Sequence, residues 1–467
     1  MRQKDSPVAA AAWAPGRGEA VALRPGVMSA ESEDGGLHLL SWQFSATYGE
    51  MTERERMVVR LLAAGPRTRR DLLAEDSDER ALDQLLSRLW QDGWLNLTVL
   101  RREIPLYTIS PLRPPPSPPA DDGDGCFVLS RLAILRRGES GFVVESPRAW
   151  CELLVHDSEA LAMIGEVLVC GTATVGQGSA LRRRLLRDLR WASLVVPRSS
   201  PEETELQLAQ WSSHELWFHE RTRLGYRGYG GRYGPTAWAR GRFEPPTPRP
   251  PEATGLALPR ADLDRLRQVD WTLTATLEDR RSARRHDDER PLTADQLGEF
   301  LYRCARTTVR KAEDGEHVGR PYPAGGSPNT LELYPVVRLV VGVNPGLYRY
   351  DPNAHQLLHV RPLDRAVRRL LKVASLVARV SEPPQVLFVV AARFEYVMWT
   401  YEAMGYALVL KNVGSLFQTM YCVATAMGLA GCALGGGDSV AFSRASGLDP
   451  FAESSVGEFI LGSRREE

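Results

Sequence analysis

The chain has 467 residues, of which 43% are hydrophobic and 25% are charged, proportions that are typical of globular proteins. Its 58 basic residues balance its 58 acidic residues, so the overall charge favours neither nucleic acid nor an anionic membrane as a partner. The absence of a signal peptide, and of any apolar run near the ~18 residues of a membrane span, predicts a cytoplasmic protein. Residues 1–36, rich in Ala, Gly, Pro and Glu, lack an apolar period and predict a disordered N-terminal tail.

Residues 37–112 predict a winged-helix module, with three helices followed by a two-stranded wing. The helices are expected over 53–64, 68–73 and 78–91, and the strands over 94–100 and 106–110. Acidic residues on the third helix would repel a phosphate backbone, so we expect no nucleic acid partner. The module resembles those that bind the leader of a precursor peptide as an added strand at the edge of the wing. A purely structural scaffold is the alternative.

Residues 113–125 are rich in proline and predict a linker. A second winged-helix-like module and a connecting segment are expected over 126–242, followed by another proline-rich linker over 243–259. His214 and His219 would lie about 140° apart on a helix, so we do not expect them to share a metal. The six cysteines include no close pair, so we expect no metal site and no disulfide framework.

The domain expected over 260–467 opens with a basic turn between two predicted helices, over 263–277 and 292–303. Arg280, Ser282 and Arg284 occupy alternate positions of this turn. Two guanidinium groups and a hydroxyl suit a terminal phosphate, which accepts charge-assisted hydrogen bonds. On charge alone, a solvated basic turn explains the same residues.

Two loops of small residues could bring backbone N–H groups close to a planar ligand, because glycine has no Cβ. The first contains Pro323, Ala324, Gly325 and Gly326 and precedes a buried strand expected over 336–343. The second follows another apolar segment and contains Leu434, Gly435 and Gly436. An ordinary flexible turn would give the second pattern too.

Apolar residues recur at three- and four-residue steps from 412 to 429, which predicts a long buried helix. Gln418 is the polar exception, and it is either a hydrogen-bonded amide of the core or a contact of the site. Before this helix, Thr400 and Tyr401 stand in the string Met-Trp-Thr-Tyr. Tyr401 alone is equally compatible with a packed aromatic residue beside Trp399.

In this order, the blocks from 260 to 467 resemble the SagB-type azoline dehydrogenases of the nitroreductase superfamily. The resemblance implies an α+β protein whose C-terminal FMN-dependent nitroreductase fold, a mostly antiparallel sheet flanked by helices, follows two winged-helix modules. It implies that Arg280, Ser282 and Arg284 hold the FMN phosphate and that Arg464 of the last strand returns toward it. The remaining flavin contacts would come from Gln418 and the two loops: Pro323, Ala324, Gly325, Gly326, Leu434, Gly435 and Gly436.

The resemblance also implies an activity and partners. The family oxidises thiazoline or oxazoline rings of a ribosomally made precursor peptide, with oxygen as electron acceptor. A cyclodehydratase makes the azolines, and two chains form a homodimer around the flavin. Alternatives are a non-catalytic docking subunit and a small-molecule nitroreductase that uses NAD(P)H.

The family's proposed catalytic pair is lysine and tyrosine, and this chain departs from it because Thr400 stands where lysine is expected. Tyr401 would accept the proton that ring oxidation releases. A tyrosine of ordinary pKa, about 10, is a poor base at neutral pH without a nearby cation. Either Arg393 or Lys411 serves Tyr401, or the chain is slow or inactive.

Overall fold

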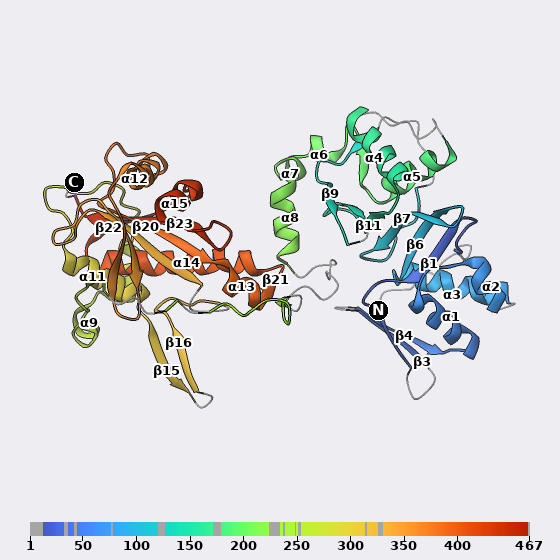
Figure 1. The fold of residues 1–467 in the computed structure, drawn as a ribbon, viewed down its shortest axis with the longest axis horizontal. Coiled ribbons are helices and arrows are strands. Elements are labelled where there is room, and N and C mark those ends of the chain that lie inside the picture. Colours follow the sequence, from blue (N-terminus) through green and yellow to red (C-terminus); the bar gives the residue numbers. More distant parts are fainter. Residues whose placement is uncertain are drawn as a thin grey trace. The chain divides into compact units, whose positions relative to one another are not determined.

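The computed structural model describes residues 13–31, 36–41, 44–75, 78–119, 127–139, 141–170, 179–223, 234–236, 239–247, 249–250, 254–312, 315–325 and 330–465. Contacts divide the chain into two compact units, residues 1–232 and 233–467 (Figure 1). Among the described helices, none combines the length and apolar character needed to cross a membrane.

The first unit is built on a seven-stranded antiparallel sheet of order β5-β1-β6-β7-β11-β10-β9, with a separate three-stranded sheet β2-β3-β4. Its elements are β1 Glu19–Leu23, β2 Met28–Glu31, β3 Gly36–Ser41, β4 Phe44–Glu50, α1 Glu53–Ala64, β5 Arg67–Thr68, α2 Arg69–Glu75, α3 Glu79–Gln91, β6 Leu95–Arg101, β7 Ile104–Pro111, β8 Phe127–Leu129, β9 Ile134–Arg137, β10 Phe142–Glu145, β11 Cys151–Val155, α4 Ser158–Cys170, α5 Ala180–Trp191, β12 Val195–Pro197, α6 Pro201–Thr204, α7 Leu206–Ala209 and α8 Ser213–Arg221.

Three helices and two strands occur where the first module was predicted, as α1, α2, α3, β6 and β7. The winged-helix assignment itself stays a prediction. The expectation that a peptide strand could add to the edge of the wing is wrong, because β6 pairs with β1 and β7 pairs with β11. Each strand of the wing therefore has a neighbour on both sides.

Part of the predicted disordered tail is ordered. Residues 19–23 form β1 between β5 and β6, and Ala20 and Val21 are buried there. A five-residue strand is too short to show an apolar period, and its partner β6 lies far along the chain, so local composition did not reveal it. Residues 1–12 and 32–35 of that prediction lie outside the described residues.

The two predicted N-terminal modules share one hydrophobic core. Trp90 of α3 stacks on Trp13 with 4.5 Å between ring centroids. The same ring meets Trp150 at 6.2 Å and Trp191 of α5 at 6.0 Å. These tryptophans join sequence stretches on both sides of the proline-rich linker, so the described parts of the unit fold together.

The second unit is built on another seven-stranded antiparallel sheet, of order β14-β19-β18-β17-β20-β23-β22. Its elements are β13 Gly234–Pro235, β14 Leu256–Ala257, α9 Leu263–Val269, α10 Leu273–Asp279, α11 Ala294–Ala305, β15 Thr308–Ala312, β16 Gly315–Gly319, β17 Leu331–Val337, β18 Gly346–Asp351, β19 Gln356–Pro362, α12 Arg365–Ala378, β20 Val386–Arg393, α13 Phe394–Thr400, β21 Tyr401–Glu402, α14 Gly405–Ala426, β22 Leu429–Leu434, α15 Ser439–Ser446 and β23 Glu453–Ser463.

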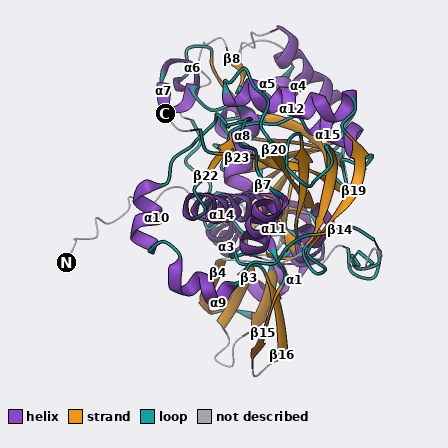
Figure 2. Cartoon of the chain, turned by 90° about the vertical axis from the view of Figure 1, so that its left-hand side faces the viewer, coloured by secondary structure: helices purple, strands orange, loops and turns teal. Residues whose placement is uncertain are grey.

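Helices cover both faces of this sheet. In β20, alternate residues face opposite ways, so Phe388 joins the core beneath α11 and α14, while Leu387 joins the core beneath α12 and α15. Figure 2 shows α11 and α14 together on one side and α12 and α15 on the other. The predicted antiparallel sheet flanked by helices is confirmed.

Three predicted elements of this unit have different bounds. The strand expected over 336–343 is β17, Leu331–Val337, because Val340–Val343 forms isolated bridges instead. The helix expected over 263–277 is two helices, and Thr272 caps the second by accepting a hydrogen bond from the Ala275 N–H. The linker expected over 243–259 is bound to the unit, since β14 pairs with β19.

Candidate active site

The basic turn after α10 is attached to the long helix α14 through Tyr421. The Tyr421 hydroxyl lies 2.9 Å from Ser282 Oγ, and it accepts a hydrogen bond of 2.9 Å from the Ala433 N–H. The Arg280 guanidinium lies 5.3 Å from the centroid of the same ring. One side chain of α14 therefore brings the basic turn to the end of β22, where the second glycine loop begins.

The arginines of this turn remain available for an anion. Arg284 and Ser282 are exposed and Arg280 is half-buried. Within the described parts of the chain, neither Arg280 nor Arg284 forms an ion pair with a carboxylate. Unpaired guanidinium groups beside a hydroxyl form a donor set that fits a phosphate.

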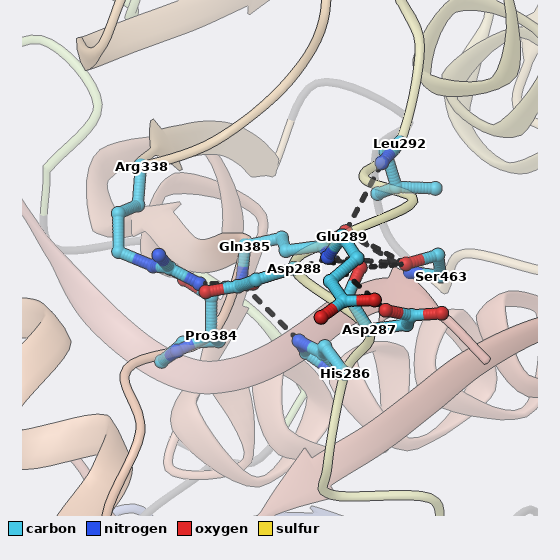
Figure 3. A network of polar contacts seen from close by, with 9 residues as sticks. All are labelled: His286, Asp287, Asp288, Glu289, Leu292, Arg338, Pro384, Gln385 and Ser463. Carbon is cyan, nitrogen blue, oxygen red and sulfur yellow. Dashed lines mark hydrogen bonds and ion pairs between the residues drawn. The ribbon is translucent and has the colours of Figure 1, made fainter. Parts of the chain in front are cut away.

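A buried amide fixes the backbone that follows the turn (Figure 3). Gln385 is fully buried, and its Oε1 accepts from the N–H groups of Leu292 and Ser463 at 3.1 and 3.0 Å. Its Nε2 donates to the Asp287 carbonyl at 2.8 Å and to Ser463 Oγ at 3.0 Å. The start of β20, the end of β23 and the segment after the basic turn are thus held by one side chain.

His286 completes this network. Its Nδ1 accepts from the Gln385 N–H at 3.2 Å, and its backbone pairs with Arg464. Burial, and then the charge of Arg338, lowers the pKa of His286 to about 4. The pairing with His286 places the backbone of Arg464 beside a residue that lies two positions after Arg284, and a role of Arg464 toward a phosphate stays a prediction.

The first small-residue loop is fixed to α14 by a second polar side chain. Asn412 is buried, its Oδ1 accepts from the Gly325 N–H at 2.9 Å, and its Nδ2 donates to the Gly325 carbonyl at 3.0 Å. A Cβ on Gly325 would lie 2.8 Å from Leu408 Cδ1, so a larger residue there would require the Leu408 side chain to move. Pro323 is exposed and Ala324 is half-buried, while Gly326 lies outside the described residues.

The second glycine loop faces open space at two of its glycines and packs against a side chain at the third. A Cβ on Gly435 or Gly436 would meet no atom within 4 Å, so this chain leaves open space beside them. A Cβ on Gly437 would lie 1.9 Å from the Glu458 carboxylate, so the loop rests on that side chain. Glu458 is buried, and burial raises its pKa. Leu434, before the glycines, is buried at the end of β22.

Thr400 and Tyr401 lie where α13 ends. The Thr400 hydroxyl donates to the Tyr396 carbonyl at 3.1 Å, and Tyr401 is half-buried in β21. Of the two cations considered for Tyr401, Arg393 is bound to Glu395 at 2.6 Å and lies over the Tyr396 ring. Lys411 is exposed on α14.

Gln418 is exposed on α14, and its Nε2 lies 3.5 Å from Cys422 Sγ. The interpretation as a core amide is therefore wrong. Sequence reasoning assigned no role to Asn412, Tyr421 or Gln385. For Asn412 and Tyr421, the sequence pattern that could have revealed a role is a polar residue within an apolar helical stripe.

Two protein families match this chain, one in each of its two compact units. Residues 127–227 match the family of the cyanobactin oxidase ThcOx, and residues 277–463 match the nitroreductase family. A Methanocaldococcus jannaschii protein named as a nitroreductase is 32% identical over 156 residues, which cover 33% of this chain and 74% of that protein. The trifolitoxin-processing protein TfxB of Rhizobium leguminosarum bv. trifolii is 27% identical over 164 residues, 34% of this chain and 44% of that protein. The chain thus spans less than half of this second relative.

Solved structures were compared as well. A nitroreductase-type protein of Ralstonia eutropha has a TM-score of 0.37 at 21% identity, covering 50% of this chain and 99% of that one. A chain of the E. coli microcin synthetase McbBCD complex has a TM-score of 0.35 at 18% identity, covering 53% of this chain and 86% of that one. Because these TM-scores are low, the family assignment rests on the sequence matches.

Glu458 predicts a pH dependence of stability. A carboxyl whose pKa is raised by folding stabilises the fold below its unfolded pKa, and this contribution is lost as pH rises through the folded pKa. Glu458→Gln should therefore melt at a higher temperature than the parent at about pH 7–8, and the difference should shrink toward acid pH. Thermal unfolding across pH measures this, with the exposed Glu382→Gln as control. If Glu458→Gln melts below the parent at neutral pH, the raised pKa of Glu458 in the folded protein is contradicted.

Proposed function

The chain belongs to the nitroreductase family, and we propose that it uses FMN to oxidise thiazoline or oxazoline rings in a ribosomally made precursor peptide. The observation that carries the proposal is the junction at Tyr421, which brings the basic turn next to the glycine loop that follows β22. A basic turn for a phosphate and a glycine loop for a planar ring, both at one junction, suit a nucleotide cofactor. The similarity to a cyanobactin oxidase and to a trifolitoxin-processing protein supports a peptide substrate.

The residues present fit FMN. Arg280, Ser282 and Arg284 would hold its phosphate, with Arg464 nearby. The ring would lie against Gly435 and Gly436, where the chain leaves open space, and the loop of Pro323, Ala324, Gly325 and Gly326 and the exposed Gln418 would complete the contacts. When bound, FMN supplies the acceptor for the hydride that leaves the azoline, and oxygen is the final electron acceptor.

Tyr401 is the proposed proton acceptor. Conversion of an azoline to an azole removes a hydride and a proton, and the proton needs a base within hydrogen-bond reach. The Thr400 hydroxyl is already bound to the Tyr396 carbonyl and carries no charge that would activate its neighbour. Lys411, exposed on α14, is the remaining candidate for that cation.

The N-terminal unit is the proposed site of leader binding. The wing has no open edge, so an added strand would pair elsewhere, and β4 has one neighbour among the described strands. It also lies beside α3, because the Tyr48 hydroxyl donates to Asp92 at 2.6 Å and Arg88 lies over the Tyr48 ring. We therefore propose that the leader pairs with β4.

Two protein partners complete the proposal. A cyclodehydratase would supply the azoline-containing peptide. A second copy of this chain would cover the apolar side chains that α9, α10 and the residues between them leave exposed next to the basic turn, namely Val269, Trp271, Leu273 and Leu277.

Two other functions make different predictions. A docking subunit without chemistry would keep the fold and bind peptide but never oxidise it. A small-molecule nitroreductase would bleach its bound flavin rapidly with NAD(P)H. Azoline turnover and flavin bleaching, measured on the same preparation, separate the three functions.

Removing the phosphate-binding guanidinium groups should release the cofactor. Each charge-assisted hydrogen bond is worth about 1.5–3 kcal/mol, so the double variant Arg280→Ala, Arg284→Ala should bind FMN roughly a hundredfold more weakly or worse. Quenching of flavin fluorescence measures the affinity. The matched control is Arg281→Ala with Arg285→Ala, which removes two exposed arginines that directly follow Arg280 and Arg284. Equal affinity in both double variants would falsify the phosphate assignment.

Proline in β4 should weaken leader binding, because proline cannot donate the backbone hydrogen bond that an added strand needs. Successive N–H groups of a strand point to opposite sides, so one of Ser45→Pro and Ala46→Pro removes an outward donor while the other disturbs β3. The variant that keeps the parent's melting temperature should bind leader peptide about tenfold more weakly by fluorescence anisotropy. Ser29→Pro on β2 is the control. Undiminished binding of the leader peptide would contradict the proposal that the leader pairs with β4.

The proton acceptor can be tested at Tyr401 and Thr400 together. Tyr401→Phe should abolish azole formation while the flavin content stays at the parent level. Thr400→Lys should raise the rate near neutral pH about tenfold or more, because it restores the cation that the family pattern contains. Tyr406→Phe, a nearby exposed tyrosine, is the control. Unchanged turnover in Tyr401→Phe would place the base elsewhere, and activity that appears only in Thr400→Lys would favour the docking subunit.

A further inference from the structure

The segment that enters the second unit is bound to the turn that carries Tyr401. The backbone of Gly234 and Pro235 pairs with Glu402 and Tyr401, as strands β13 and β21. Thr236 follows and is almost completely buried, with 1% of its surface exposed. Its N–H donates to the Thr400 carbonyl at 3.1 Å, and its Oγ1 donates to the Met398 carbonyl at 2.7 Å.

These contacts supply hydrogen-bond donors to backbone carbonyls at the C-terminal end of the short helix α13. The last carbonyls of α13 have no partner within the helix, and Thr236 supplies donors for two of them. Three residues after Thr400, Ala403 has φ of 61°, a left-handed conformation that residues with a Cβ adopt at some energetic cost. A turn of this kind persists only when its surroundings hold it.

The same segment is anchored again further along. Arg393 donates to the Thr247 carbonyl at 3.2 Å. Arg249 donates to the Tyr334 hydroxyl at 3.1 Å and forms an ion pair with the buried Glu453. The bonds at Thr236 are therefore made by a segment that is itself fixed to β17, β20 and β23.

We propose that Thr236 is a positioning residue, which fixes the turn from Met398 to Glu402 and so sets the direction of the Tyr401 hydroxyl. The catalytic meaning of this role rests on the proposed function. The residue lies outside the blocks that resemble the family, in a stretch that the sequence assigned to a connecting segment. The first described residues of the second unit thereby contribute to its site.

Thr236→Val keeps the shape and the backbone N–H but removes the hydroxyl, and Thr236→Ser keeps the hydroxyl. In the full chain, Thr236→Val should accelerate amide hydrogen exchange from Thr400 to Met404 and lower kcat for an azoline peptide about tenfold, with KM and flavin content unchanged. Thr236→Ser should return the exchange rate and kcat toward the parent values. Ser375→Ala, which removes a buried hydroxyl bond to the Leu371 carbonyl in α12, controls for the loss of one such bond.

Unchanged exchange in Thr236→Val overturns the proposal, and so does faster exchange with unchanged kcat. An equal effect of Ser375→Ala on kcat would also overturn it, because the loss would then be general. If the parent oxidises no azoline, the proposed function fails, and the exchange data alone decide whether Thr236 holds the turn.

Discussion

Two polar side chains on one long helix, which buries one face against the sheet, fix the backbone around the candidate site. Asn412 binds the backbone of the first small-residue loop, and Tyr421 binds the backbone of β22 at Ala433, directly before the second glycine loop. Tyr421 also reaches the basic turn. Nine residues of helix separate them, which is about 13 Å along the axis. A buried polar group that loses its partner costs about 1–3 kcal/mol, so the loops are tied to the helix. The apolar face of α14 is in turn fixed by the sheet, which makes the geometry of the site a consequence of the core.

The basic turn is held in place from two sides. Tyr421 holds the turn on one side, and the buried amide of Gln385 holds the segment that follows it. Neither Arg280 nor Arg284 is neutralised by a carboxylate in the part of the chain that the structure describes. Guanidinium groups that are held in place and left unpaired serve an anionic ligand better than they serve stability. This arrangement supports the proposal that the turn binds the phosphate of a cofactor.

The candidate site residues that the sequence indicated are those whose residue type is itself informative, and their roles stay predictions. Alternating arginines and runs of glycine are visible locally, and so is the apolar stripe of α14. Gln385, Asn412 and Thr236 were not assigned roles, because each acts through partners roughly 80 to 160 residues away, as in the bond from Thr236 to Met398. For the same reason β1 was missed and the wing was expected to have an open edge. Strand pairing over long sequence distances decides both, and no local pattern records it.

We propose that this chain removes two hydrogens from an azoline ring despite threonine at position 400. Mass spectrometry of an azoline-containing precursor peptide, incubated with the FMN-loaded protein under oxygen, tests it directly. We expect the peptide mass to fall by two hydrogens for each ring converted. An unchanged peptide mass, with flavin fully bound and the peptide bound to the protein, would contradict it and leave a docking subunit in its place.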